Sequence, residues 1–243
     1  MDIGLIGSDG KMGHAVNEAV VDTSHKIIVG FDINNPVNEA DISTCDVLID
    51  FSSASALETN LDMALAKGIP FVTGTTGWYD KTNSLKEKVE KSKGSFLYAS
   101  NFSIGVLLFH KLFARTAELY GSFSQYDFAL HEIHHNQKAD SPSGTALTLA
   151  AEVLKRLNQK KDVQIGNPPA KIAADKLQVS SSRVGSIPGT HMLYVDSPQD
   201  TIEVIHRAKG RAGFAAGAIK AAEWLTGRKG FYSIDDMINT LVK

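Results

Sequence analysis

A histidine-rich segment followed by a Pro-Ser-Gly-Thr turn carries the residues best suited to acid–base chemistry. The run His131-Glu132-Ile133-His134-His135 is followed by Lys138 and by residues 141–145 (SPSGT). Protonated His and Lys side chains can act as general acids. Residues 144 onward have a helical pattern, and the free amides of Gly144 and Thr145 at its start would bind an anion. The segment therefore predicts a pocket for a small anionic substrate that takes up a proton.

Two other interpretations of this segment must be weighed. His131 to His135 matches the zinc-protease pattern H-E-x-x-H, which needs both histidines on one helical face. The alternation over residues 126–135 predicts a strand instead, where residues four apart are separated by roughly 13 Å, too far to share one zinc ion. We therefore expect no metal site, with Glu132 and His134 on one strand face and His131, Ile133 and His135 on the other. The second alternative is an ordinary helix cap by Ser143.

A glycine-rich turn near the start of the chain would suit a dinucleotide. Gly7, Gly10 and Gly13 lie between an expected strand and an expected helix. There, glycines permit a tight turn and a close approach of backbone amides to a pyrophosphate. The G-x-x-G-x-x-G spacing departs from the commoner G-x-G-x-x-G, so a turn without a ligand is the alternative.

Two later features favour the dinucleotide. Asp32 ends the second expected strand, where a carboxylate accepts hydrogen bonds from ribose hydroxyls. Residues 74–77 (GTTG) follow the fourth expected strand, at the edge where ligands bind in such sheets. The charge of Asp32 disfavours a 2′-phosphate, whereas Lys11 would offset that repulsion. NADH and NADPH therefore both stay open.

The elements that must position these residues follow an alternating order at first. Short apolar runs predict strands at 2–6, 25–31, 46–51, 69–73 and 95–99. Helical patterns fill 12–21, 54–67 and 79–93, and Gly68 is placed to end the second of them. Strands alternating with helices predict an α/β fold with a doubly wound, Rossmann-like parallel sheet.

The second half of the chain has a different pattern. A long apolar helix at 102–120 is followed by an alternating, exposed strand at 124–135 and a helix at 144–158. Two strand-like stretches lie within 179–206, around 185–189, and closing helices are expected at 213–226 and 234–241. Antiparallel strands with helices on one face indicate a C-terminal α+β domain.

Composition narrows the functional classes. The chain has 243 residues, of which 43% are hydrophobic and 21% charged, with a net charge of −2 and one cysteine. These values exclude a disordered chain and a multi-cysteine metal site, and they disfavour nucleic acid as a partner. No apolar run approaches the ~18–20 residues needed to span a bilayer, and no basic leader segment is apparent. We expect a cytoplasmic protein with neither nucleic acid nor membrane as its partner.

Residues 134–138 (HHNQK) and 140–146 (DSPSGTA) resemble the signature of the 4-hydroxy-tetrahydrodipicolinate reductase (dihydrodipicolinate reductase) family of bacterial lysine and diaminopimelate biosynthesis. The similarity extends to 7–13, 74–77, 99–103 and the tail 206–225. It implies reduction of 4-hydroxy-2,3,4,5-tetrahydrodipicolinate, a small dicarboxylate, to 2,3,4,5-tetrahydrodipicolinate by NADH or NADPH, with loss of water. It also implies a homotetramer, with a dinucleotide-binding domain of 1–101 and 214–243 and a substrate-binding and tetramerisation domain of 102–213.

The resemblance further implies roles for individual residues. His134 matches the proton donor and Lys138 a second acid, and which of the two delivers the proton stays open. Substrate-binding positions fall on His135, Gly144 and Thr145. The implied cofactor-binding residues are Gly7, Ser8, Asp9, Gly10, Lys11, Met12, Asp32, Gly74, Thr75, Thr76, Ala99, Ser100, Asn101 and Phe102.

Several positions depart from the family pattern. Lys11 stands where Arg is frequent, residues 32–33 (DI) stand where many members have Glu-Arg, and residues 136–137 (NQ) stand where many have Arg-His. Candidate cations to replace the missing charge are Lys171, Arg183, His191 and Arg211. The alternative function is another small two-domain NAD(P)-dependent amino-acid or semialdehyde dehydrogenase, which has no reason to carry the histidine–lysine–PSGT block. A nicotinamide-sensing regulator would need a DNA-binding module, for which the chain leaves no obvious room.

Overall fold

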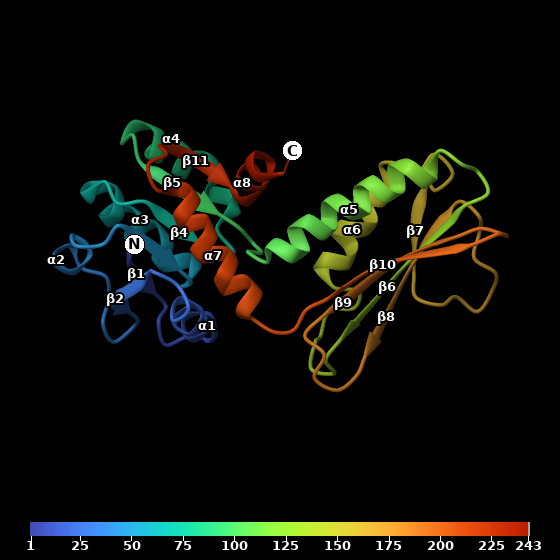
Figure 1. Cartoon of the computed structure of the whole chain (residues 1–243), viewed down its shortest axis with the longest axis horizontal. Helices are drawn as coiled ribbons and strands as arrows, with labels where there is room; N and C mark the ends of the chain where they lie inside the picture. Colours follow the sequence, from blue (N-terminus) through green and yellow to red (C-terminus); the bar gives the residue numbers. More distant parts are fainter. Residues whose placement is uncertain (243) are drawn as a thin grey trace. The chain divides into compact units, whose positions relative to one another are not determined.

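The computed structural model describes residues 1–242 and separates the chain into two compact units (Figure 1). The first comprises Met1–Ile104 and the chain from Arg211 onward, and the second comprises Gly105–Gly210. The chain therefore leaves the first unit once and returns to it. These divisions lie a few residues from the domain boundaries expected at 101/102 and 213/214.

The first unit is built on a six-stranded parallel sheet in the order β11-β5-β4-β3-β1-β2. Its strands are β1 (Asp2–Ile6), β2 (Lys26–Phe31), β3 (Val47–Asp50), β4 (Phe71–Thr73), β5 (Ser95–Tyr98) and β11 (Gly230–Ser233). This confirms the expected α/β fold with its doubly wound, Rossmann-like parallel sheet. Strand β11 was not expected, because its four residues lie between two helical patterns and carry no run of β-branched side chains.

Helices cover both faces of this sheet. They are α1 (Lys11–Val20), α2 (Glu39–Ile42), α3 (Ala54–Lys67), α4 (Thr82–Lys91), α7 (Ala212–Leu225) and α8 (Ile234–Leu241), with a 3₁₀ turn at Tyr79–Lys81. The apolar faces of α2, α3 and α4 share one core cluster with Leu48, Phe71 and Phe96 of the sheet. Helix α7 packs against α1 and against β3, β4 and β5. As the sequence predicts, α3 ends at Gly68, which takes a left-handed conformation with φ 67°.

The strand order reverses between β1 and β3, which places the ligand crevice of this sheet at their carboxyl ends. The turn after β1 holds the three glycines, and β2 ends at Phe31, beside Asp32. The GTTG segment follows β4. The glycine turn, Asp32 and the GTTG segment, which lie apart in the sequence, therefore meet along one edge of the sheet.

The second unit contains a five-stranded sheet in the order β10-β9-β6-β8-β7. Its elements are α5 (Ile104–Gly121, beginning at the unit boundary), β6 (Asp127–His134), α6 (Gly144–Leu154), β7 (Asp162–Ile165), β8 (Lys176–Arg183), β9 (Thr190–Asp196) and β10 (Thr201–Arg207). Within the part of the chain that the structure describes, no helix is long and apolar enough to cross a membrane.

Three expectations for this sheet were wrong in detail. The sheet is mixed rather than antiparallel, because β6 and β8 run parallel, as do β7 and β8. Residues 179–206 form parts of three strands rather than two, because a tight turn in which Ser197 N–H donates to Asp200 C=O separates β9 from β10. Strand β6 is central and not exposed, since alternation reports one buried face and says nothing of position within the sheet.

One face of this sheet carries the core of the second unit. Helices α5 and α6 both pack on it, against Phe128 and Leu130 of β6 and apolar residues of β8 and β9 (Figure 1). From Phe128 onward, side chains of β6 alternate between buried and half-buried. Glu132 and His134 therefore continue the buried row that begins with Phe128.

The packing of α7 within the first unit can be tested at Gly217. A Cβ atom built there would lie 1.7 Å from the backbone oxygen of Phe102. Gly217→Ala should lower the free energy of unfolding by about 2 kcal/mol or more, because overpacking outweighs the gain of about 1 kcal/mol in helix propensity. Urea denaturation followed by circular dichroism measures the change. Ala216→Ser, at an exposed position of the same helix, serves as control, and an unchanged midpoint for Gly217→Ala would contradict the packing described.

Candidate active site

The turn between β1 and α1 requires its glycines because backbone segments meet there at close range. Gly7 has φ 80°, and a Cβ atom on it would lie 2.5 Å from the Phe51 oxygen. A Cβ atom on Gly13 would lie 2.3 Å from the Gly7 oxygen. Helix α1 begins after Gly10, which provides no side-chain cap, so the first amides of the helix are free to receive an anion. This cradle fits the pyrophosphate of a dinucleotide.

Asp32 is tied to the same turn. One carboxylate oxygen accepts the Asp9 N–H at 3.1 Å and the other accepts the Ile33 N–H at 2.7 Å. The Ser8 hydroxyl donates to the Phe31 oxygen at 3.3 Å, which joins the turn to the end of β2. Beside these residues lies a cavity of about 370 Å³, in which Asp32 is the only charged residue among the described residues that line it.

Two further cavities continue along the carboxyl edge of the sheet. One, of about 380 Å³, is lined by Lys11, Met12, Gly74, Thr75 and Thr76 among others. The other, of about 290 Å³, is lined by Met12, Phe51, Gly74, Ala99, Ser100, Asn101, Phe102, Arg211 and Phe214. The structure thus brings the expected cofactor residues together along the ends of four strands, β1, β2, β4 and β5. Lys11 and Asp32 line different cavities.

Sequence reasoning missed several residues of this edge. Ser52 and Ser53 line two of the cavities, and Phe51 lines all three. Their signal was their place at the end of the third expected strand and directly after it, at the same edge as the other loops. The sequence indicates Arg211 only as a candidate cation for the substrate, and nothing in the sequence indicates that Phe214 lines a site.

Asp50 is a buried carboxylate beneath these loops. It accepts hydrogen bonds from the hydroxyls of Ser52 at 2.5 Å, Thr73 at 2.7 Å and Thr75 at 2.8 Å. Burial raises the pKa of Asp50, and the hydroxyl hydrogen bonds oppose that increase. The buried Thr75 hydroxyl therefore already donates its hydrogen bond within the protein, whereas the Thr76 side chain is exposed to solvent.

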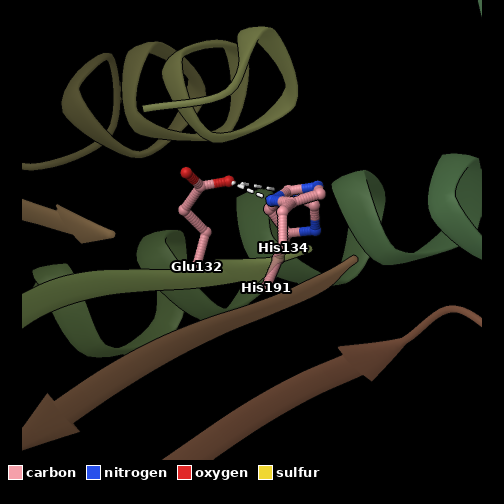
Figure 2. A group of neighbouring side chains, drawn as sticks. All are labelled: Glu132, His134 and His191. Carbon is pink, nitrogen blue, oxygen red and sulfur yellow. Dashed lines mark ion pairs between the residues drawn. The ribbon is translucent and has the colours of Figure 1, made fainter. Parts of the chain in front are cut away.

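The proton-donor candidate of the second unit lies in a buried polar cluster (Figure 2). His134 Nδ1 lies 2.7 Å from Glu132 Oε2, and His191 Nε2 lies 3.9 Å from the same oxygen. The His134 and His191 rings meet edge to face, with centroids 5.3 Å apart. His134 is only 7% exposed and Glu132 is 0% exposed. The expected partition of β6 is confirmed, because His131 lies on the other face, where its ring contacts the Ser180 hydroxyl at 2.7 Å.

The Glu132 carboxylate carries the charge of this cluster. Its Oε1 accepts the Arg183 guanidinium at 2.8 Å and the Ser143 N–H at 3.1 Å. Burial alone would raise its pKa, but hydrogen bonds from Ser143, Arg183 and Ser181 and the nearby His134 lower the pKa to about 2. Burial is the main reason that the pKa of His191 falls to about 4.

Glu132, His134 and His191 also have the ligand types of a metal site. Arg183 already neutralises Glu132 at ion-pair distance, so a divalent cation would have to enter beside a guanidinium. The zinc-protease pattern is not realised, because its residues lie in strand β6 and not on a helix. The cluster is better explained as an acid–base site than as a metal centre.

The expected anion site lies at the start of α6. Ser143 caps the helix, because its hydroxyl accepts the Ala146 N–H at 3.2 Å. The helix-cap alternative is therefore confirmed for the Ser143 side chain. Gly144 and Thr145 are the first two residues of the helix. The Asp140 carboxylate contacts Lys138 Nζ at 2.7 Å, and its pKa is lowered mainly by Lys138 and to a smaller extent by the neighbouring Gly144 N–H. A carboxylate of the protein itself thus lies on the donors expected to bind the substrate.

The remaining candidates are placed as follows. The backbone oxygen of His135 accepts the Lys138 N–H at 3.2 Å, which holds the two in one turn. Among the proposed replacement cations, Arg183 and His191 belong to the Glu132 cluster, whereas Arg211 lines a cavity of the first unit. Lys171 is exposed and lies in none of the helices or strands.

Comparison with known proteins agrees with this geometry. Residues 1–102 match the family model for the N-terminus of dihydrodipicolinate reductase, and residues 105–238 match that for its C-terminus. A 4-hydroxy-tetrahydrodipicolinate reductase of Christiangramia forsetii is 38% identical over 246 residues, covering 100% of both chains. One from Campylobacter lari is 36% identical and covers 98% of this chain and 99% of its own.

A solved structure supports the fold. The dipicolinate-bound dihydrodipicolinate reductase of Paenisporosarcina sp. TG-14 aligns with a TM-score of 0.76 at 21% identity, covering 97% of this chain and 98% of that one. A probable dehydrogenase from Thermotoga maritima aligns less closely, with a TM-score of 0.58 at 9% identity, covering 97% of this chain and 92% of that one. Both halves of the chain match the family and the relatives span its full length, so the chain belongs to the dihydrodipicolinate reductase family.

Proposed function

We propose that the chain reduces 4-hydroxy-2,3,4,5-tetrahydrodipicolinate to 2,3,4,5-tetrahydrodipicolinate, consuming NAD(P)H and a proton and releasing water, in diaminopimelate-dependent lysine biosynthesis. The observation that carries the proposal is that buried His134, against Glu132, lies within electrostatic reach of Lys138, in a chain whose two halves both match the family. Another amino-acid or semialdehyde dehydrogenase is not favoured, because full-length relatives carry the reductase name. We also place this biosynthetic enzyme in the cytoplasm.

The N-terminus of α6 would bind one substrate carboxylate. Gly144 and Thr145 present amides there, and the helix dipole stabilises a partly buried anion by up to ~2 kcal/mol. Lys138 adds a positive charge and His135 lies in the same turn. A bound substrate carboxylate would take the place of the Asp140 carboxylate on Lys138 and Gly144, because both are acceptors for the same donors.

Proton delivery would fall to His134 or Lys138. NAD(P)H, when bound, supplies the hydride, and the charge that develops on the substrate ring must then be neutralised by a proton. General acid catalysis of this kind contributes typically 10²–10⁴-fold. Burial keeps His134 in a water-poor environment, and Glu132 opposes the resulting decrease of its pKa.

The first unit would bind the cofactor, with the glycine turn holding the pyrophosphate and residues 99–102 at the nicotinamide end. We further propose that NADH is preferred over NADPH. Asp32 is the only charged group among the described residues lining the first cavity, and Lys11 lines another. A 2′-phosphate would therefore meet a carboxylate and no compensating cation.

Cofactor preference can be measured directly. With substrate generated from pyruvate and aspartate semialdehyde by the preceding enzyme of the pathway, kcat/KM should be at least about tenfold higher for NADH than for NADPH, because like charges near a protein surface repel by more than 1.4 kcal/mol. Asp32→Asn should bring the ratio of kcat/KM for NADH to that for NADPH closer to one. Asp22→Asn, on the exposed surface, should leave this ratio unchanged. Equal rates for the two cofactors in the unmodified enzyme would refute the preference. Cofactor binding without substrate-dependent oxidation would refute the reaction.

Lys138 provides a second test. Lys138→Ala should lower kcat about 10²-fold or more, because a general acid and an anion contact are lost together, while the Kd for NADH is unchanged. Lys155→Ala, which removes an exposed lysine of the same unit, controls for charge. Stopped-flow turnover and fluorescence titration of NADH separate the two quantities. Full turnover in Lys138→Ala would remove this residue from the mechanism.

We also propose a homotetramer formed through the sheet of the second unit. Helices α5 and α6 occupy one face of that sheet, whereas Ala129, His131 and Ile133 on the other face of β6 are half-buried. Light scattering should give four times the chain mass of 26.2 kDa. Ile133→Glu, which places a charge on this face, should reduce the mass of the assembly. A single-chain mass for the unmodified protein would contradict the assembly.

A further inference from the structure

The Glu132 carboxylate lies against the proposed proton donor. It is completely buried, and its Oε2 lies 2.7 Å from His134 Nδ1 (Figure 2). Both of these atoms are buried, and among the described residues neither has a partner in full hydrogen-bond geometry, so their 2.7 Å contact is a close ion-pair contact. His191 Nε2, at 3.9 Å from Oε2, lies further away, which leaves His134 Nδ1 as the nearer ring nitrogen.

The other carboxylate oxygen is held by groups that can only donate. Arg183 Nη2 and the Ser143 N–H lie 2.8 Å and 3.1 Å from Oε1. A guanidinium and a backbone amide cannot accept a hydrogen bond, so Oε1 must be an acceptor and the orientation of the group is fixed. Oε2 is then the oxygen that faces His134.

This arrangement determines which His134 nitrogen carries hydrogen. Facing an acceptor, Nδ1 holds its hydrogen, and Nε2 is left as the nitrogen that loses and regains a proton. A Cβ atom on Gly189 would lie 3.0 Å from Nε2, so a glycine at this position leaves that side of the ring uncovered.

We propose that Glu132 is a positioning residue of the reductase: it selects the Nδ1–H form of His134 and thereby makes Nε2 the proton-donating atom. Through the Ser143 N–H, the same carboxylate also holds the start of α6, which connects the proton donor to the anion site. The catalytic consequence rests on the proposed function, whereas the tautomer does not.

The charges around His134 determine how the pKa of His134 changes when the Glu132 charge is lost. Burial lowers its pKa most, Lys138 and Arg183 lower it further, and Glu132 raises it. His191 also faces it, and the low pKa of about 4 keeps that ring neutral near pH 7. Loss of the Glu132 charge therefore lowers the pKa of His134. The decline of activity on the alkaline side then moves to lower pH, because an acid must be protonated to donate.

Glu132→Gln tests the tautomer without turnover. Arg183 and the Ser143 N–H still need an acceptor, so the glutamine oxygen should replace Oε1 and its NH₂ should face His134 Nδ1. Neutral His134 should then change from the Nδ1–H to the Nε2–H form. NMR of ¹⁵N-histidine-labelled enzyme detects this change, with the His134 signals identified by their absence in His134→Gln. Glu152→Gln, the same substitution on the outer surface of α6, should leave the form unchanged.

Turnover measures the consequence. In Glu132→Gln, kcat should fall about 10²-fold, its alkaline decline should move to lower pH, and the KM for NADH should hold. Glu132→Asp keeps the charge, so it should keep the Nδ1–H form and recover part of kcat. Glu152→Gln should match the unmodified enzyme in both measurements.

The outcomes are distinct. An Nε2–H form of His134 in the unmodified enzyme overturns the proposal even if Glu132→Gln does not fold. An unchanged Nδ1–H form in folded Glu132→Gln also overturns it. A changed form with unchanged kcat overturns the catalytic consequence and removes His134 as donor, while NADH oxidation in the unmodified enzyme still tests the reaction itself.

Discussion

The second unit depends on the burial of one negative charge. Glu132 has no contact with water, and an unpaired carboxylate in such a place would cost several kcal/mol or more. The compensating groups come from β8, through Arg183, and from the turn before α6, through Ser143. The parallel pairing of β6 with β8 and the start of α6 are therefore tied to a single side chain. His134 lies two residues further along the same strand face and shares this environment.

The first unit depends on a different constraint, the close approach of backbone segments at one edge of the sheet. Gly7 and Gly13 leave no room for a side chain, and the space that they leave is filled by carbonyl groups of the turn and of the segment after β3. Such packing turns the amides of the α1 N-terminus toward the crevice instead of burying them. The proposed phosphate site is thus a consequence of how the turn closes.

The sequence predicted these constraints unequally. Local signals located the turn, all five early strands and the faces of β6, because periodicity and glycine spacing act over a few residues. They did not reveal β11, the parallel pairing in the second sheet, or the carboxylates of Asp50 and Glu132 as site residues. Those features arise from contacts between distant segments, such as Glu132 with Arg183. The roles of His134 and Lys138 came from resemblance to a family rather than from the pattern alone.

The two buried carboxylates show why the type of donor matters more than burial itself. Asp50 accepts hydrogen bonds from three hydroxyls, which can donate or accept, and from the Ser52 N–H at 3.3 Å, but it has no charged donor, and burial raises its pKa. Glu132 receives a guanidinium and a backbone amide, which can only donate, and its pKa falls to about 2. The carboxylate beside His134 is therefore an anion near neutral pH. In the mechanism proposed above, a proton lost by His134 would then be replaced from outside the pair rather than from Glu132, as a reductase that consumes one proton per turnover requires.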